Sequence, residues 1–168
     1  MRAAVFQKYG PASELTIRSV ERPQPKATEV LIKVHASSIN PIDWKIRNGY
    51  FVLRCLFGLI RPRKNILGID FAGEIIRVGT AANKFKLHDQ VFGAISGGTY
   101  AEYVCAEESK IFYKPQSMSF QNAAGVPLAG LTALQALRDK GAIRPTDNVL
   151  VYGASGGVGS FAVQLARS

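Results

Sequence analysis

The sequence predicts a mainly β, barrel-like domain, followed by helices and then by the first strand and helix of an α/β unit. Three observations lead to this fold class. Residues 1–114 hold several short runs rich in β-branched and aromatic residues, separated by Gly, Pro and Asp. After Pro115, apolar residues recur at helical spacing instead. Near the C-terminal end, a short apolar run leads into a glycine-rich turn and a second helical pattern.

Length and composition allow a folded core. The 168 residues suffice for one domain plus a remnant, or for one large domain, and 47% of them are hydrophobic. The formal net charge is +9, from 21 basic and 12 acidic residues. Because the basic residues are scattered and form no strip with aromatic residues, we expect no nucleic-acid partner.

The β domain is expected to contain seven short strands and one helix. In residues 29–38, Val30, Ile32 and Val34 alternate with other residues, so one strand face lies in the core and His35 faces outward. Asn40 before Pro41 predicts a helix N-terminus, and Gly49 predicts its end. The expected strands cover residues 2–7, 14–20, 29–38, 68–79, 85–93, 97–105 and 110–114.

Residues 51–67 form an unusual stretch that is first apolar and then basic, FVLRCLFGLIRPRKNIL. Three interpretations remain open. The stretch is a flexible wall or lid over an apolar substrate, a segment that seeks a membrane surface, or an ordinary packed loop.

Two helices are predicted after Pro115. Ser119 caps a short first helix, and the second helix ends at Gly141. The apolar face of the second helix is formed by Leu128, Leu131, Leu134 and Leu137. We therefore divide the chain into a β domain, residues 1–118, and the start of an α/β domain, residues 119–168.

The last twenty residues predict a dinucleotide-binding turn. Residues 149–152 read as a buried strand, and residues 153–159 (GASGGVG) as a turn that opens a helix. A diphosphate binds backbone N–H groups at such a helix N-terminus, where a Cβ would obstruct it. The pattern is a variant of G-x-G-x-x-G with Ala154 at the first position. The predicted cofactor-binding residues here are Ala154, Ser155, Gly156, Gly157, Val158 and Gly159; a plain tight turn is the alternative.

The sequence stops one helix into this unit, at Ser168. The residue that would read the ribose lies about 20 residues beyond the glycines. We therefore expect an incomplete Rossmann domain, either in a fragment of a longer protein or in a chain that has lost its second domain.

The sequence predicts no metal site and no membrane span. Cys55, Cys105, His35 and His88 show no ligand-pair spacing. Two isolated cysteines fit a reducing compartment, and the N-terminus does not resemble a signal peptide. No apolar stretch reaches about 18 residues. We expect a cytoplasmic protein.

Six short motifs follow one another along the chain: residues 36–43 (ASSINPID), 68–73 (GIDFAG), 98–103 (GTYAEY), 123–127 (AAGVP), 131–133 (LTA) and 153–159. With these motifs the chain resembles the zinc-independent quinone oxidoreductase branch, related to zeta-crystallin, of the medium-chain dehydrogenase/reductase superfamily. The resemblance implies a GroES-like β domain, a nucleotide-binding Rossmann domain, an active site in the cleft between them and a homodimer at full length.

The resemblance also implies the chemistry. Zinc alcohol dehydrogenases of the superfamily place a cysteine and a Gly-His-Glu motif where this chain has Ile39-Asn40 and Gly68-Ile69-Asp70. Without a Lewis acid, the implied reaction is hydride transfer from NADPH, with NADH as the alternative cofactor, to a quinone or an α,β-unsaturated carbonyl. A non-catalytic binding or interaction module, formed by the truncated chain, is the alternative function.

Four residues outside the glycine turn take implied roles from the family. Asn40 donates to the substrate oxygen, or only caps its helix. Tyr50 donates a proton or walls the pocket, or only packs. Asp43 orients its neighbours. Thr132 lies near the nicotinamide, or packs within its helix.

Overall fold

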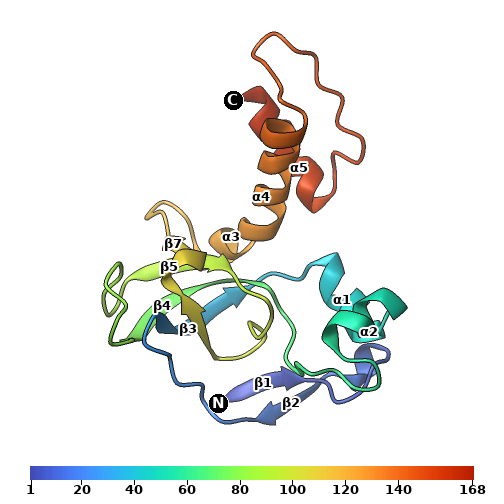
Figure 1. Ribbon diagram of the computed structural model, residues 1–168. Coiled ribbons are helices and arrows are strands. Elements are labelled where there is room, and N and C mark those ends of the chain that lie inside the picture. The colour runs from blue at the N-terminus through green and yellow to red at the C-terminus, as the bar shows by residue number, and fades with distance from the viewer. The chain divides into compact units, whose positions relative to one another are not determined.

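The computed structural model describes residues 1–168, and the chain forms two compact units, Met1–Gly125 and Val126–Ser168. The first unit is built mainly from antiparallel strands and the second from helices (Figure 1). The predicted order of a β domain followed by helices is therefore confirmed. No helix of the chain combines the length and the apolar character needed to cross a bilayer.

The first unit contains a five-stranded antiparallel sheet and a separate two-stranded hairpin. Bridges from Ala3 to Ala101 and from Val5 to Ile66 connect the hairpin to other segments of the unit. The hairpin consists of β1 (Arg2–Val5) and β2 (Thr16–Ser19). The five-stranded sheet has the strand order β6-β3-β4-β5-β7. Its strands are β3 (Glu29–Ser37), β4 (Asp70–Val78), β5 (Gln90–Ala94), β6 (Tyr103–Glu107) and β7 (Ile111–Tyr113). The first unit also contains two single 3₁₀ turns, η1 (Ala12–Glu14) and η2 (Glu108–Lys110).

The main core lies against one face of the five-stranded sheet. Val30 and Ile32 of β3 are fully buried, as predicted, and His35 is exposed and stacks on Phe120. Leu31 is buried too, against the predicted alternation, at an irregularity in the pairing of β3 with β4. The buried members of this core are Val30, Ile32, Phe71, Ile75, Phe85, Val91, Val104, Ala106 and Ile111.

Two helices follow β3 in the first unit. Helix α1 (Pro41–Asn48) begins after Asn40 and ends at Gly49, which adopts φ 68° and ψ 49°, as the sequence predicts. Helix α2 (Phe51–Phe57) was not predicted as a helix. Leu53 and Phe57 lie one turn apart on α2 and pack against a second core cluster of Phe6, Ile46 and Leu67, which stabilises this turn of helix.

The short helix α3 (Phe120–Ala124) belongs to the first unit. Asn122 donates its N–H to the Ser119 hydroxyl at 3.1 Å, which confirms the predicted cap. Ala123 and Ala124 are buried against Ala72 of β4. Because these small side chains let the helix pack directly on the sheet, the division between the units falls after Gly125 and not after residue 118.

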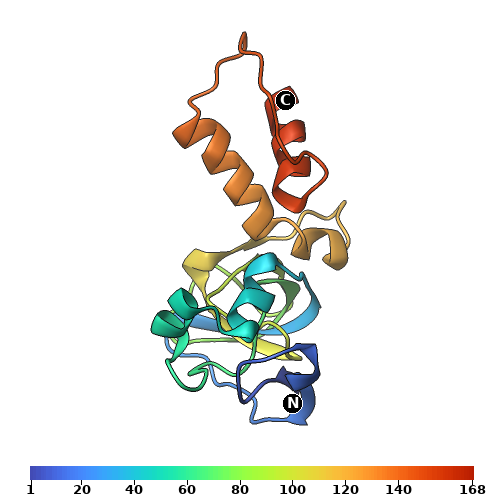
Figure 2. The same ribbon diagram turned by 90° about the vertical axis from the view of Figure 1, so that its right-hand side faces the viewer.

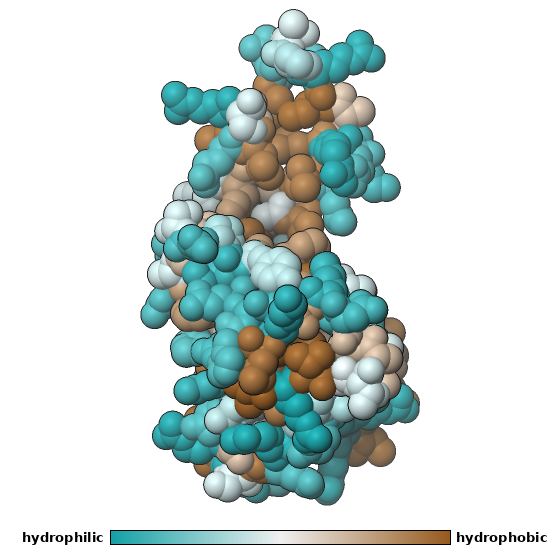
Figure 3. Space-filling view, turned by 90° about the vertical axis from the view of Figure 1, so that its left-hand side faces the viewer, coloured by the Kyte–Doolittle hydropathy of each residue, from teal (hydrophilic) through white to brown (hydrophobic).

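The second unit pairs two helices. Helix α4 (Pro127–Leu134) continues as a π-helical stretch, η3 (Gln135–Lys140), and a long loop leads to α5 (Gly157–Arg167) (Figure 1). Gly130 of α4 lies close to Phe161 of α5. In the space-filling view, hydrophobic residues gather on this helical unit (Figure 3).

The strand predicted at residues 149–152 does not form. These residues have no regular secondary structure, and Leu150 and Tyr152 are 94% and 101% exposed. A β-strand needs a neighbouring strand to receive its N–H and C=O groups, and the second unit contains none. The prediction of a formed strand was therefore wrong for this chain, although its apolar composition is real.

Candidate functional site

A cluster of buried polar side chains lies where β3 ends, α1 begins and β4 starts. Asp70 and Asp43 are 0% and 3% exposed, and Asn40 and Thr99 are also buried. The antiparallel pairing of β3 with β4 brings Ser37 opposite Phe71, next to Asp70. Residues far apart in the sequence therefore meet at one edge of the sheet.

Asp43 joins three segments of the chain through its carboxylate. Its Oδ2 accepts the backbone N–H of Asn40 at 2.8 Å and the hydroxyl of Tyr100 at 3.0 Å, and its Oδ1 accepts the N–H of Gly68 at 3.2 Å. Burial, followed by the nearby Asp43 charge, raises the pKa of Tyr100 well above its usual value, so the phenol stays protonated and donates. Asp43 thus ties the start of α1 to Gly68 and Tyr100, and its implied role at a catalytic site stays a prediction.

Asp70 receives the side chains of Ser38 and Asn40. The Ser38 hydroxyl donates to Asp70 Oδ2 at 2.8 Å. Asn40 Nδ2 donates to the same oxygen and to Ser38 Oγ, both at 3.0 Å. Both hydrogens of the Asn40 amide are therefore directed at groups of the protein, and Asn40 also occupies the N-cap position of α1.

Ser37 and Thr99 extend this network toward the loop before β6. The Ser37 hydroxyl donates to the backbone oxygen of Asp70 at 2.7 Å and lies 2.7 Å from Thr99 Oγ1, from which it accepts. Gly68 has φ 90°, and a Cβ there would lie 2.2 Å from Thr99 Oγ1. Only glycine fits this close approach.

Sequence reasoning assigned no role to Ser37, Ser38, Asp70, Thr99 or Tyr100. One signal was available for Asp70, which is a carboxylate directly followed by the apolar or small residues Phe71–Gly73 at the start of a strand. A buried carboxylate requires several donors, so its partners had to come from neighbouring segments. Which segments supply them depends on the sheet pairing.

Tyr50 lies outside the buried network. Its side chain is exposed and its ring packs edge-on against Trp44, with ring centroids 5.7 Å apart. Its hydroxyl makes no hydrogen bond within the chain, so it remains available to a ligand. The structure therefore does not bring Tyr50 into contact with Asn40 and Asp43.

No three His, Cys, Asp or Glu side chains gather closely enough to hold a metal ion. The cysteines and histidines lie in separate places. Cys55 is exposed, while burial, followed by the charge of Glu29, raises the pKa of Cys105 to about 11. His88 Nδ1 lies 2.6 Å from Glu74 Oε1.

In the second unit, residues 153–159 form a tight turn that opens α5. Gly153 has φ 77°, and its carbonyl accepts the N–H of Gly156, the N-cap residue, at 3.1 Å. A Cβ on Gly159 would lie 2.1 Å from the Gly153 oxygen and 2.8 Å from Ala154 Cα. Glycine is therefore required at position 159 by the packing of the turn on the first turn of the helix.

The outer side of this turn is open. A Cβ on Gly156 or Gly157 would meet its nearest atom only at 3.4 or 3.9 Å, and Ala154 and Ser155 are exposed. The first N–H groups of α5, from Gly157 onward, have no intrahelical acceptor. These donors, at the positive end of the helix dipole, fit a diphosphate group.

Thr132 lies on α4 and is exposed. Its hydroxyl donates to the backbone oxygen of Leu128 at 2.6 Å, one helical turn earlier. The oxygen keeps its acceptor capacity, so the side chain is free to accept a hydrogen bond from a ligand.

The class of protein follows from the strand order, the buried polar cluster and the glycine turn taken together. Residues 26–116 match the alcohol dehydrogenase GroES-like domain, and the chain belongs to this family.

Within it, the resemblance to quinone oxidoreductases is confirmed. The chain is 42% identical to the chloroplastic quinone-oxidoreductase homolog of Spinacia oleracea, over 99% of this chain and 52% of that protein. The structure of the quinone oxidoreductase from Coxiella burnetii is similar with a TM-score of 0.89 and 41% identity, over 99% of this chain and 53% of that one. The structure of Escherichia coli quinone oxidoreductase, solved in complex with NADPH, is similar with a TM-score of 0.86 and 29% identity, over 99% of this chain and 49% of that one. The chain spans about half the length of the curated relatives it matches.

Proposed function

We propose that this chain is part of an oxidoreductase that transfers a hydride from NADPH to a quinone or an α,β-unsaturated carbonyl without zinc. The observation that carries the proposal is the turn at residues 153–159, whose packing excludes a Cβ at Gly159 and leaves the N-terminus of α5 open. The names of the relatives support the reaction class, and the NADPH complex of the E. coli enzyme supports the cofactor. NADH is the second cofactor candidate.

The glycine turn fits the diphosphate of such a cofactor. Backbone N–H groups at the start of α5 would hold its anionic oxygens, and Gly156 and Gly157 would let them approach the main chain. The reduced nicotinamide, when bound, supplies the hydride. Thr132 would accept a hydrogen bond from the cofactor, since its own proton is committed to Leu128.

On the substrate side, Tyr50 and Asn40 are the candidate donors to the oxygen that gains charge. The Tyr50 hydroxyl has no partner within the chain, so donation by this group disrupts nothing. Asn40 would have to release one of its bonds to Ser38 and Asp70. We therefore assign Asn40 and Asp43 mainly to holding the start of α1 in place, and Tyr50 to direct contact.

The donor chemistry near Asn40 explains why zinc is left out of the proposal. Ile39 carries no ligand atom, and the Asn40 amide donates its hydrogens to Ser38 and Asp70. A quinone or enone needs no metal, because its conjugated oxygen already accepts charge. A cytoplasmic location and a homodimer at full length complete the proposal.

The test is the oxidation of NADPH by a quinone in the whole protein that contains this chain, followed through the absorbance of the reduced nicotinamide. We expect turnover that survives a metal chelator. Gly159→Ala should weaken NADPH binding at least about tenfold by distorting the turn, whereas Gly125→Ala, which lies outside the turn and has room for a Cβ, should bind nearly as wild type. Absence of turnover, or equal effects of the two substitutions, would overturn the proposal.

A further inference from the structure

One segment of the first unit concentrates positive charge. Between Asp43 and Asp70 the chain contains no acidic residue. We define the apolar–basic segment as residues 44–64, which carry the cations Lys45, Arg47, Arg54, Arg61, Arg63 and Lys64. The two carboxylates that bound the segment are buried and point into the polar cluster described above, so they do not neutralise its surface.

None of these cations has a carboxylate partner. The ion pairs of the chain join other residues: Arg2 to Glu102, Lys8 to Glu14, Lys26 to Glu29, His88 to Glu74 and Arg138 to Asp139. Arg54 donates to the Gly49 carbonyl, and Lys64 contacts Ser96. Neither of these partners carries a negative charge, so the charges of Arg54 and Lys64 stay uncompensated. Arg61 and Arg63 are exposed.

The same segment exposes large apolar side chains. They are exposed by 64% to 86%: Phe51, Val52, Leu56, Leu59 and Ile60. On α2, Leu53 and Phe57 face the core, whereas residues 51, 52, 55 and 56 share the opposite side. The helix is thus apolar on both sides although only one side is buried, which is uncommon for a surface helix. Figure 2 shows α1 and α2 on the side of the unit that faces the viewer.

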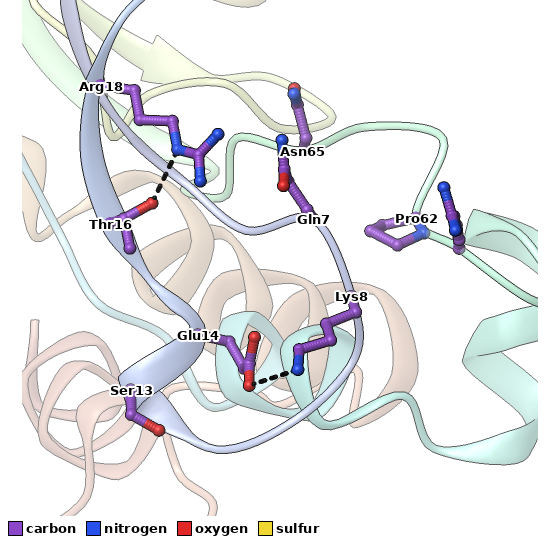
Figure 4. Close-up of a pocket in the computed structure, with 9 residues that line it drawn as sticks. Gln7, Lys8, Ser13, Glu14, Thr16, Arg18, Pro62 and Asn65 are labelled. Carbon is purple, nitrogen blue, oxygen red and sulfur yellow. Dashed lines mark hydrogen bonds and ion pairs between the residues drawn. The ribbon is translucent and has the colours of Figure 1, made fainter.

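A polar groove adjoins the segment. It has a volume of 520 Å³ and is lined by Arg61, Pro62 and Asn65 together with residues of the β1–β2 hairpin (Figure 4). Lys8 and Arg18 add two cations to its lining, and only Lys8 is paired, with Glu14 at 3.3 Å. The groove therefore extends the positive rim of the apolar surface.

We propose that the apolar–basic segment docks the protein on the surface of a bilayer that contains anionic lipids. The exposed aliphatic and aromatic side chains would enter the boundary between headgroups and acyl chains, while the arginines and lysines would contact the lipid phosphates. Charge complementarity selects this occupant. A nucleic acid would use the cations but has no use for exposed Val52, Leu59 and Ile60, and a purely apolar partner would not require six cations free of carboxylates.

The chain provides its own reporter for this docking. Trp44 is the single tryptophan and lies in the segment, in edge contact with Tyr50. The test measures co-sedimentation of the full chain with vesicles of phosphatidylcholine alone and of phosphatidylcholine mixed with phosphatidylserine, together with Trp44 emission. We expect binding to the anionic vesicles with a blue shift of the emission, weak binding to the neutral vesicles, and loss of binding at high salt.

Two pairs of variants locate the contact. Arg61→Gln with Arg63→Gln should lower the partition coefficient on anionic vesicles by about twenty-fivefold, at about fivefold for each charge. Val52→Ser with Ile60→Ser should lower it about tenfold or more. The matched control is Lys86→Gln with Leu87→Ser, an exposed cation and an exposed leucine of the same unit outside the segment, which should bind as wild type.

Several results would overturn the proposal. They are absence of binding to anionic vesicles at low salt, equal loss in the segment and control variants, or a Trp44 emission that does not shift. Self-association that depends on Val52 and Ile60 without vesicle binding would assign the surface to a second copy of the chain instead. The substituted side chains of the segment, Arg61, Arg63, Val52 and Ile60, are all exposed, and far-ultraviolet circular dichroism checks that each variant is folded. The arginine pair tests the proposal even where the apolar pair fails to fold.

Discussion

Replacing Asp43 with alanine should lower the stability of the first unit by about 2 to 6 kcal/mol. The carboxylate accepts the N–H groups of Asn40 and Gly68 and the hydroxyl of Tyr100. Asn40 and Gly68 are buried, so water cannot replace the lost acceptor. Each orphaned donor costs about 1 to 3 kcal/mol, whereas half-buried Tyr100 can turn toward solvent.

The assay is urea unfolding of the chain followed by Trp44 fluorescence, which reports on the helix that contains Asp43. For a slope of about 2 kcal/mol per molar urea, the midpoint should fall by about 1 to 3 M. Asp43→Asn keeps the size and one acceptor oxygen, so it should lose less than the alanine variant and remains measurable if the latter does not fold.

The matched control is Asp89→Ala. Asp89 also accepts the N–H three residues before it, from Lys86 at 2.7 Å, but Lys86 is exposed. Water can therefore replace this bond, and the loss should stay below about 1 kcal/mol. If Asp43→Ala costs no more than Asp89→Ala, the three-way contact of Asp43 does not hold the candidate site together.

Two further predictions concern titration and reactivity. Burial tends to raise the pKa of Glu108, but bonds from the N–H groups of residues 83–85 outweigh it and leave this pKa below the usual 4.5. The carboxylate therefore stabilises the fold fully above about pH 4.5 and progressively less as the pH falls through the folded-state pKa. Glu108→Gln removes this dependence and should flatten the acid limb of a plot of unfolding midpoint against pH. An unchanged acid limb would contradict the prediction. A maleimide at neutral pH should label exposed Cys55 well before Cys105, whose pKa of about 11 keeps its thiol protonated, and peptide mapping that finds Cys105 labelled first would refute the assignment.

Local rules predicted the elements whose cause lies within a few residues. Alternation placed Val30 and Ile32 in the core, Asn40 and Gly49 marked the ends of α1, and Ser119 capped α3. Each of these signals acts through the residue itself or through a neighbour within one turn. Helix α2 was not predicted because both of its sides are apolar, so its sequence shows no amphipathic pattern, although one of these sides is exposed.

Long-range pairing decided what local rules could not. The apolar run at residues 149–152 has the composition of a strand, but a strand exists only where another strand accepts its hydrogen bonds. The candidate site shows the same dependence. Asn40 and Asp43 were singled out from the sequence, but Asp70 joins them only because β3 pairs with β4, and Thr99 only because the loop before β6 contacts Ser37 and Gly68.

The sequence by itself determined the order of a β domain and a glycine turn, the family, and the lack of acidic residues between Asp43 and Asp70. These properties follow from residue type and spacing along the chain. Only the tertiary structure decided that both of those aspartates are buried, that Gly159 packs on its own turn, and that Val52 and Ile60 remain on the surface. Burial is a relation between segments distant in sequence, so no local pattern fixes it.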